Sequence, residues 1–365
     1  MFRANGVVVV VPAHDEALCI ERAILTMPAF VDLLLIIDDG STDRTAEIAY
    51  RACTESGRQS SEHASSHSAF SILHQPHSGV GRAVYTGFEH VLEMRTRGEL
   101  ARIAPQATDW CISVMDADGQ MDPDDLPFLL EPLLDGRVDH VKGDRSRHRS
   151  GLKGMPPSRR LGSSMLALLT RLASGYRDIN DPQCGYRAVS LDMLQQVDLD
   201  DCWEGYGYPN HWLIGAGSAG FRLGQVAVRT LYADELSGLR IHRFLPSVSL
   251  MLLRGLWRRG WNWYVRGDGM PVGSAYRRAG VVTGWFSAWI ALGLIALTPA
   301  HWIGLSTIAI TALTMAERID SVECSRRSSA GSEPPGEIHN KEGMRGHSCE
   351  ERGSPLRTSR IQTAP

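Results

Sequence analysis

The sequence predicts an α/β fold in which helices cover a mostly parallel sheet. Three apolar runs have the length of strands: "VVVVV" (7–11), "LLLII" (33–37) and the shorter "ISVM" (112–115). Strands that are apolar on both faces are typical of a buried parallel sheet. Helical patterns over 16–27 and 42–53 follow the first two runs. This alternation indicates a Rossmann-like α/β domain.

Composition narrows the possible function classes. The chain has 365 residues, of which 43% are hydrophobic, and a formal net charge of -3. These values suit one sizeable globular domain with additions, and the charge balance argues against nucleic acid as a partner. The seven cysteines form no Cys-x-x-Cys pair. Scattered thiols are typical of a reducing compartment, so we expect a cytosolic catalytic part that begins with its first strand rather than a signal peptide.

Acidic residues gather directly after the third apolar run. The stretch "MDADGQMDP" places Asp116, Asp118 and the amide of Gln120 on one short loop. Open α/β sheets bind ligands at the carboxyl ends of their strands. Carboxylate and amide oxygens suit Mg²⁺ or Mn²⁺, with substrate phosphates completing the shell. We therefore predict a divalent metal that holds a diphosphate here.

Two further strand ends carry acids. "VPAHDE" supplies Asp15 and Glu16, and "IIDDGSTDRT" supplies Asp39. Acids at this edge can accept hydrogen bonds from base N–H groups and ribose hydroxyls. We expect Ser41 and Asp43 to cap the following helix and Asp39 to meet a ligand.

One glycine-rich segment and one polar segment have simpler interpretations. "GVGRAVYTG" (79–87) precedes a helix, so it is either a phosphate loop or a tightly packed turn, and the sequence leaves both open. Residues 54–69 are polar and rich in serine, which predicts a surface loop.

The chain changes character after residue 240. Residues 241–278 are basic and contain several tryptophans, as expected of an amphipathic segment at an anionic membrane surface. Residues 279–316 contain no Asp, Glu, Lys or Arg, which predicts a transmembrane or re-entrant helical hairpin. Residues 317–365 lack aromatic residues and are predicted to be a disordered tail. The catalytic domain is assigned to residues 1–240.

Six ordered motifs resemble glycosyltransferase family 2, and most closely its dolichyl- or polyprenyl-phosphate mannosyltransferase branch. The resemblance covers residues 7 to about 240, and its motifs are "VVVPAHDEA", "IIDDGSTDRT", "GVGRAVYTGF", "MDADGQMDP", "VKGDR" and "DPQCGYRAVS". It implies a GT-A fold and an inverting transfer of one sugar from a nucleotide sugar, GDP-mannose or a UDP-hexose, to a polyprenyl or dolichyl phosphate. The membrane is then a partner, with the catalytic domain on its cytosolic face.

The resemblance also implies roles for individual residues. Those expected to bind the nucleotide are Pro12, Ala13, Asp15, Glu16, Asp39 and Asp116. Those expected to hold Mg²⁺ or Mn²⁺ are Asp116, Asp118 and Gln120. Those expected to act in catalysis are Asp118, Arg145, Arg160, Asp181 and Arg187. Arg145 and Arg160 would meet the acceptor phosphate or the donor diphosphate, because the arginine fork grips phosphate with two hydrogen bonds. Asp181, Gln183 and Arg187 would lie on the acceptor side.

The chain departs from the family pattern in places. It has His14-Asp15 where Tyr-Asn is common, and 201–212 lacks the QxxRW signature of processive synthases, which favours addition of a single sugar. Two alternatives remain. The acceptor could be a hydroxyl of a lipid-linked saccharide or another glycan, with Asp181 or Glu204 as base. The chain could also be a membrane-tethered scaffold with a decayed transferase domain.

Overall fold

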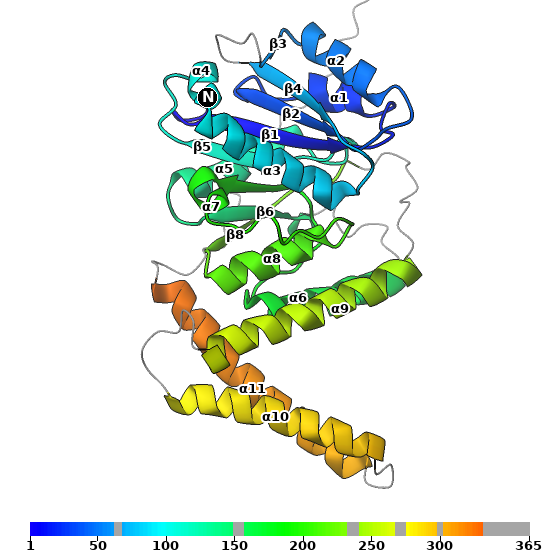
Figure 1. The fold of residues 1–365 in the computed structure, drawn as a ribbon, viewed down its shortest axis with the longest axis vertical. Helices are drawn as coiled ribbons and strands as arrows, with labels where there is room; N and C mark the ends of the chain where they lie inside the picture. Colours follow the sequence, from blue (N-terminus) through cyan, green and yellow to red (C-terminus); the bar gives the residue numbers. More distant parts are fainter. Residues whose placement is uncertain (62–67, 149–156, 232–240, 267–274, 298–301, 331–365) are drawn as a thin grey trace, which may run out of the picture.

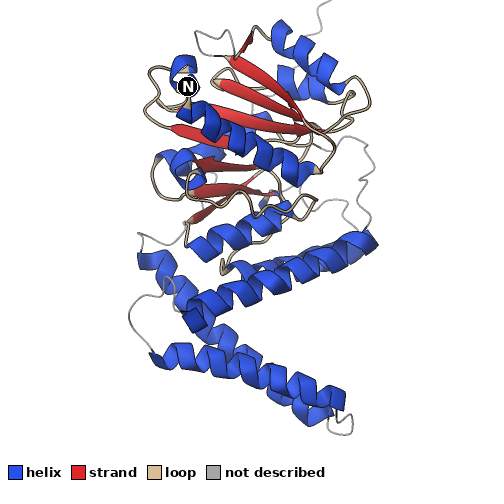
Figure 2. Ribbon diagram, viewed as in Figure 1, coloured by secondary structure: helices blue, strands red, loops and turns tan. Residues whose placement is uncertain are grey.

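Each of the three predicted apolar runs forms a buried strand. The computed structural model describes residues 1–61, 68–148, 157–231, 241–266, 275–297 and 302–330. Within these residues, eight strands form one sheet in the order β3-β4-β2-β1-β5-β7-β6-β8 (Figures 1 and 2). The strands are β1 (Gly6–Ala13), β2 (Leu33–Asp38), β3 (Gln59–Ser60), β4 (Ala69–His74), β5 (Trp110–Val114), β6 (His140–Asp144), β7 (Arg187–Ser190) and β8 (Leu223–Ala227).

The sheet is mostly parallel, as predicted. β1 pairs in parallel with β2 and with β5, so that Val8 lies beside Leu33 on one side and Ile112 on the other. Only β7, among the described strands, runs antiparallel to its neighbours β5 and β6. This arrangement matches the expected GT-A-like α/β architecture.

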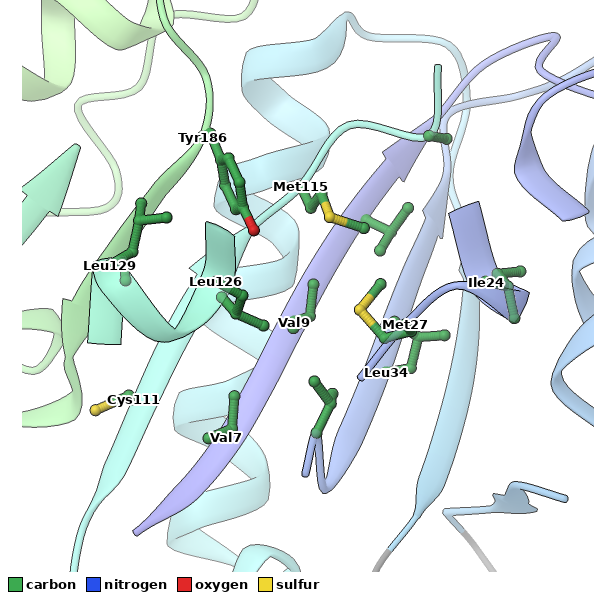
Figure 3. Close-up of a cluster of buried hydrophobic side chains, with 14 of the residues drawn as sticks. Val7, Val9, Ile24, Met27, Leu34, Cys111, Met115, Leu126, Leu129 and Tyr186 are labelled. Carbon is green, nitrogen blue, oxygen red and sulfur yellow. The ribbon is translucent and has the colours of Figure 1, made fainter. Parts of the chain in front are cut away.

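Helices cover both faces of the sheet, which explains why its central strands are apolar throughout. Val7, Val9 and Val11 of β1 point into one core (Figure 3). That core also contains residues of α1 (Ile20–Leu25), α2 (Thr45–Glu55) and α5 (Leu126–Leu134). Val8 and Val10 point into the opposite core. There they meet α3 (Val80–Thr96), α7 (Leu191–Leu194) and α8 (Tyr208–Ala219).

Shorter elements complete the domain. They are α4 (Glu99–Ile103) and the single-turn helices η1 (Pro123–Asp125) and η2 (Arg145–Arg147). The polar stretch 54–69 was expected to be a surface loop; it includes the short edge strand β3, and residues 62–67 lie outside the described part of the chain.

A set of long helices lies beside the sheet domain (Figure 2). These are α6 (Pro157–Ser174), α9 (Ile241–Gly260), the π-helical segment η3 (Trp261–Arg266), α10 (Ala275–Leu297) and α11 (Trp302–Ala330). α10 and α11 form a close pair, in which a Cβ atom at Gly284 would lie 2.9 Å from the carbonyl oxygen of Ala312. The region 279–316 thus contains two closely packed helices, and residues 298–301 between them lie outside the described ranges.

Two predictions about the hairpin need correction. Among the helices that the structure describes, none is both long enough and apolar enough to cross a membrane, so the expected transmembrane character of 279–316 is not supported. Glycine, serine and threonine interrupt the apolar residues throughout this region. In addition, α11 continues to Ala330, past the predicted boundary at 316 and into the segment expected to be disordered. Residues 331–365 lie outside the described ranges.

Candidate active site

The acidic loops predicted from the sequence meet at one edge of the sheet. β1, β2, β4, β5 and β6 all point the same way, so their carboxyl ends share this edge. β7 runs in the opposite direction and therefore begins there, with Arg187 as its first residue. Strands from distant parts of the sequence thus deliver the predicted site residues to a common place.

Asp116 and Asp118 form the acidic centre of this edge. Asp116 Oδ1 is buried and has no hydrogen-bond partner within the described residues. Burial and the charge of Asp118 raise the pKa of Asp116 to about 7, although Arg187 and Arg145 oppose the shift. Asp118 Oδ1 accepts a hydrogen bond of 2.9 Å from the backbone N–H of Gln120. A buried carboxylate beside a second one is stabilised by a neutralising cation or by a proton.

Gly185 packs closely against the acidic centre. A Cβ atom at Gly185 would lie 3.0 Å from Asp116 Oδ2 and 3.0 Å from Tyr208 Oη. The hydroxyl of Tyr208 is buried and, like Asp116 Oδ1, has no hydrogen-bond partner in the described part of the chain. Unsatisfied buried polar atoms are a sign of a missing polar ligand. The oxygen donors present fit Mg²⁺ or Mn²⁺.

Arg145 and Asp181 form a tight ion pair next to this centre. Arg145 Nε donates to Asp181 Oδ2 at 2.6 Å and Nη2 donates to Oδ1 at 2.9 Å. Burial alone would raise the pKa of Asp181, but Arg145 and the nearby Lys142 lower it below its ordinary value. Lys142 also donates to the backbone carbonyl oxygen of Asp181. A carboxylate held this firmly in its ionised form is a poor general base.

Arg187 lies behind the acidic centre rather than open to solvent. Arg187 is only 3% exposed to solvent, and its Nε donates a hydrogen bond to the carbonyl oxygen of Gly185 at 3.2 Å. The guanidinium carbon lies 4.9 Å from the centre of the Tyr208 ring. Its charge reaches Asp116 electrostatically. The buried position suits a role in holding the acidic centre, and the predicted place of Arg187 on the acceptor side stays a prediction.

Gln183, predicted on the acceptor side, and Arg160, predicted to meet a phosphate, are both connected to α6. Gln183 donates a hydrogen bond to Asn210, which is fully buried and donates in turn to Thr170 Oγ1 at 2.6 Å. These bonds connect Gln183 to α6 through Asn210. Arg160 falls in α6, but its side chain lies outside the described part of the chain.

On the nucleotide side, Asp39 organises the loop that follows β4. Its Oδ1 accepts from Ser78 N at 2.9 Å and from Gln75 Nε2 at 2.6 Å, and its Oδ2 accepts from Gly79 N at 2.8 Å. The residue is 2% exposed. Its role in contacting a nucleoside stays a prediction, because the observed bonds lie within the chain.

Asp15 and Glu16 support the start of α2. Asp15 accepts a hydrogen bond of 2.7 Å from the backbone N–H of Thr42, and this bond lowers the pKa of Asp15. The Glu16 N–H donates to Thr45 Oγ1 at 2.8 Å. Asp43 accepts from Thr45 N at 2.9 Å, although the N-cap residue of α2 is Arg44, whose side chain makes no capping bond.

Pro12 and Ala13 end β1 beside the acidic centre. The carbonyl oxygen of Pro12 accepts a hydrogen bond of 3.3 Å from Ala117, which lies between the two acidic residues. The expected nucleotide and metal residues are therefore continuous along this edge of the sheet.

The glycine-rich segment 79–87 packs against protein instead of presenting a free helix end. The Gly81 N–H donates to the carbonyl oxygen of Glu204 at 2.7 Å. A Cβ atom at Gly81 would lie 1.9 Å from the carbonyl oxygen of Trp203. Of the two interpretations left open above, the tightly packed turn is the one observed.

Sequence reasoning missed Tyr208 and Lys142. Tyr208 lies in a helix far along the chain, and only the folded structure brings its hydroxyl to Gly185. Lys142 belongs to the "VKGDR" motif, from which only Arg145 was predicted to be a site residue. The motif was therefore a signal that could have identified Lys142.

Comparison with known proteins identifies the family of this chain. Residues 8–198 match the family described as glycosyl transferase family 2. A relative from Methanococcus voltae, UDP-N-acetylglucosamine–dolichyl-phosphate N-acetylglucosaminyltransferase, is 26% identical over 62% of this chain and 85% of its own length. The undecaprenyl-phosphate mannosyltransferase of Micrococcus luteus is 28% identical over 69% of this chain and 96% of its own.

One solved structure is also similar. It is glucosyl-3-phosphoglycerate synthase from Mycobacterium tuberculosis in complex with Mn²⁺, UDP and glucosyl-3-phosphoglycerate, with 20% identity, a TM-score of 0.45 and coverage of 70% of this chain and 80% of that one. The family match spans more than half of the sequence. The chain therefore belongs to glycosyl transferase family 2 and is a glycosyltransferase.

Proposed function

We propose that this enzyme transfers a single sugar, with inversion, from a nucleotide sugar to a polyprenyl phosphate. The observation that carries the proposal is the pair Asp116 and Asp118, with its unsatisfied oxygen, facing the ion pair of Arg145 and Asp181. Both relatives reported above are named for transfer to a lipid phosphate. Their names differ in the sugar, so GDP-mannose and UDP-hexoses remain the candidate donors.

Asp116 and Asp118 are the residues that would hold Mg²⁺ or Mn²⁺, with Gln120 on the same loop. When bound there, a divalent metal supplies positive charge to the diphosphate leaving group of the donor. Arg187 stands behind Asp116 and holds its carboxylate in place through charge. Tyr208 Oη, which lies close to Gly185 and has no hydrogen-bond partner among the described residues, would donate to a phosphate oxygen of the donor.

A phosphate acceptor needs no general base, which agrees with the ion-paired state of Asp181. An oxygen of the lipid phosphate is already anionic, so it can form the new bond to sugar C1 while the bond from C1 to the diphosphate breaks. No proton has to be removed in that step. Asp181, locked onto Arg145 with a depressed pKa, suits positioning of the arginine more than proton abstraction. The Arg145 side chain is 38% exposed, and its guanidinium would meet a phosphate.

The helices beside the sheet domain support a place at the membrane surface. α9 and the start of η3 expose a helical stripe of apolar and basic side chains: Leu250, Leu253, Arg254, Trp257, Arg258 and Trp261. Such a stripe suits binding to an anionic bilayer, where a polyprenyl phosphate resides. We place the catalytic domain on the cytosolic face.

A donor screen tests this function. The protein is incubated with vesicles containing polyprenyl phosphate and with radiolabelled GDP-mannose, UDP-glucose or UDP-N-acetylglucosamine, with Mn²⁺ or with EDTA, and the lipid is extracted. We expect one donor to give a labelled lipid only with the metal. Asp118→Asn should reduce the rate by about 100-fold or more, because charge stabilisation of the leaving group is lost.

Matched control variants distinguish loss of the active site from a general effect of substitution on the protein. Asp124→Asn removes a nearby carboxylate that is 82% exposed and should leave the rate unchanged. Gly185→Ala places a Cβ atom 3.0 Å from Asp116 Oδ2 and should lower the rate, whereas Gly205→Ala meets its nearest atom only at 3.8 Å and should not. Label in a soluble or lipid-linked saccharide instead of the lipid phosphate would overturn the proposed acceptor. Nucleotide binding with no transfer to any acceptor would point to a decayed transferase domain.

A further inference from the structure

Two histidines and one aspartate gather beside the acidic centre, on three different loops. His14 follows β1, Asp39 follows β2 and His77 follows β4. One ligand atom from each of these residues lies within 4.8 Å of the others. The two imidazole rings are stacked with their centres 4.0 Å apart. Neighbouring parallel strands bring these residues together, although they are separated in the sequence.

Short contacts hold the two imidazoles against Asp39, and the three ligand atoms lie within 4.8 Å of one another. His77 Nδ1 lies 3.0 Å from Asp39 Oδ2, and His14 Nδ1 lies 2.8 Å from the Asp39 carbonyl oxygen. His77 Nδ1 lies 3.2 Å from that same carbonyl oxygen. Bond lengths of about 2.0–2.1 Å in a tetrahedral site place ligand atoms roughly 3.3 Å apart. The separation of His77 Nδ1 and Asp39 Oδ2 is close to this value.

The accessibility of the three residues also suits a metal. Asp39 is anchored by Ser78 N, Gly79 N and Gln75, so its carboxylate is fixed before any ion arrives. The side chains of His14 and His77 are 38% and 59% exposed, which leaves a path from solvent. A rigid buried carboxylate and two accessible imidazoles are a typical entry arrangement for a metal site.

We propose that His14, Asp39 and His77 form a binding site for a transition-metal ion of the Zn²⁺ class, separate from the site at Asp116 and Asp118. Two imidazole nitrogens with one carboxylate favour Zn²⁺ or Co²⁺ over Mg²⁺, which prefers oxygen ligands alone. Water would complete the shell. The ion joins the loops after β1, β2 and β4 and so stabilises the edge of the sheet on which Asp15 and Asp39 lie.

The inference is tested with the metal alone, without nucleotide. The full-length protein is titrated with Zn²⁺ by calorimetry and with Co²⁺ by visible absorption. We expect one equivalent of Co²⁺ to give the d–d bands of a four- or five-coordinate site without an intense sulfur charge-transfer band. The midpoint temperature of thermal unfolding should rise when Zn²⁺ is added, because a ligand that binds only the folded state stabilises that state.

Variants locate the site. His14→Ala and His77→Gln should each lower Zn²⁺ affinity at least tenfold and abolish the thermal shift, and the glutamine at 77 retains a hydrogen-bonding group. His74→Ala is the control, because His74 is 65% exposed and pairs with Asp38 rather than with the cluster. Asp118→Asn should leave this binding intact, which separates it from the proposed catalytic metal.

Three outcomes would overturn the proposal. The first is retention of the Zn²⁺ equivalent in both His14→Ala and His77→Gln. The second is a strong sulfur charge-transfer band, which would assign the ion to a cysteine such as Cys19. The third is an unmutated protein that gives no Co²⁺ d–d bands, a result that does not depend on any variant being folded.

Discussion

At the scale of single residues, burial decides which titratable groups change their chemistry. His140 is fully buried between Tyr176 and Trp212. Trp212 Nε1 can only donate, so it donates to His140 Nδ1 at 3.4 Å. Tyr176 donates its hydroxyl to the carbonyl of Phe221, which leaves the tyrosine oxygen to accept from His140 Nε2 at 3.0 Å. His140 is therefore a neutral imidazole with its proton on Nε2.

This neutral histidine predicts acid sensitivity. Burial and the charge of Arg187 lower the pKa of His140 to about 3, from an ordinary value of 6.5. Between these two values the unfolded chain binds a proton that the folded chain does not, so the free energy of unfolding falls as pH falls. We expect a slope of about 1.4 kcal/mol per pH unit from this group below pH 6.5. Urea unfolding at a series of pH values measures it.

A variant assigns the slope to this residue. His140→Gln should flatten the pH dependence of stability between about pH 6 and pH 4, even if its stability at neutral pH is lower. His74→Gln, at an exposed position, should keep the slope of the unmutated protein. An unchanged slope in His140→Gln would show that another group is responsible.

At the scale of elements, the start of α3 shows how a glycine motif serves packing. Gly81 approaches the backbone of Trp203 and Glu204, and a Cβ atom at Gly87 would lie 2.4 Å from Val10 Cγ1. These contacts let α3 lie directly on β1 and on the segment before α8. The helix thereby fixes the position of Tyr208, which begins α8 next to Gly185.

The packing role predicts opposite effects for two helical glycines. Gly81→Ala should lower the free energy of unfolding by about 1–3 kcal/mol, because the added methyl group collides with backbone that has little room to move. Gly215→Ala in α8 should raise it by up to about 1 kcal/mol, since a Cβ there meets nothing within 4 Å and alanine favours helix. Denaturant unfolding followed by tryptophan fluorescence gives both values. A Gly81→Ala protein as stable as the unmutated chain would refute the packing role.

The sequence predicted elements best where both faces of a strand are buried. The runs 7–11 and 33–37 are apolar because helices cover both sides of the sheet, and Asp116 and Asp118 follow from their position after β5. It could not predict the burial of Arg187, because the rings of Tyr208 and Trp212 that cover it come from a distant helix. The end of α11 was missed for a related reason. Charges from Glu317 onward resemble a solvated tail, yet Asp320 is only 7% exposed.

At the scale of the whole molecule, one buried ion pair fastens the C-terminal helices to the sheet domain. Arg259 of α9 is fully buried and donates to Asp320 of α11 at 2.9 and 2.7 Å. It also donates to the carbonyl oxygens of Leu172 and Ala173 in α6 at 2.7 and 3.1 Å. The hydroxyl of Tyr264 donates to Asp320 as well. The position of α11 therefore depends on a charge that α9 and α6 enclose.

Breaking this pair should release α11 without unfolding the sheet. Asp320→Ala leaves the Arg259 charge buried and unpaired, a change that costs about 3–5 kcal/mol. We expect faster amide hydrogen exchange across 302–330, with exchange in β1, β2 and β5 unchanged.

Asp201→Ala, which removes an exposed pair with Arg258, should cost about 0–1 kcal/mol and leave exchange in α11 unaltered. The double variant Arg259→Met with Asp320→Leu should recover part of the protection, because no unpaired charge remains. Unchanged exchange in α11 of Asp320→Ala would mean that apolar contacts between α10 and α11 alone hold the helix in place.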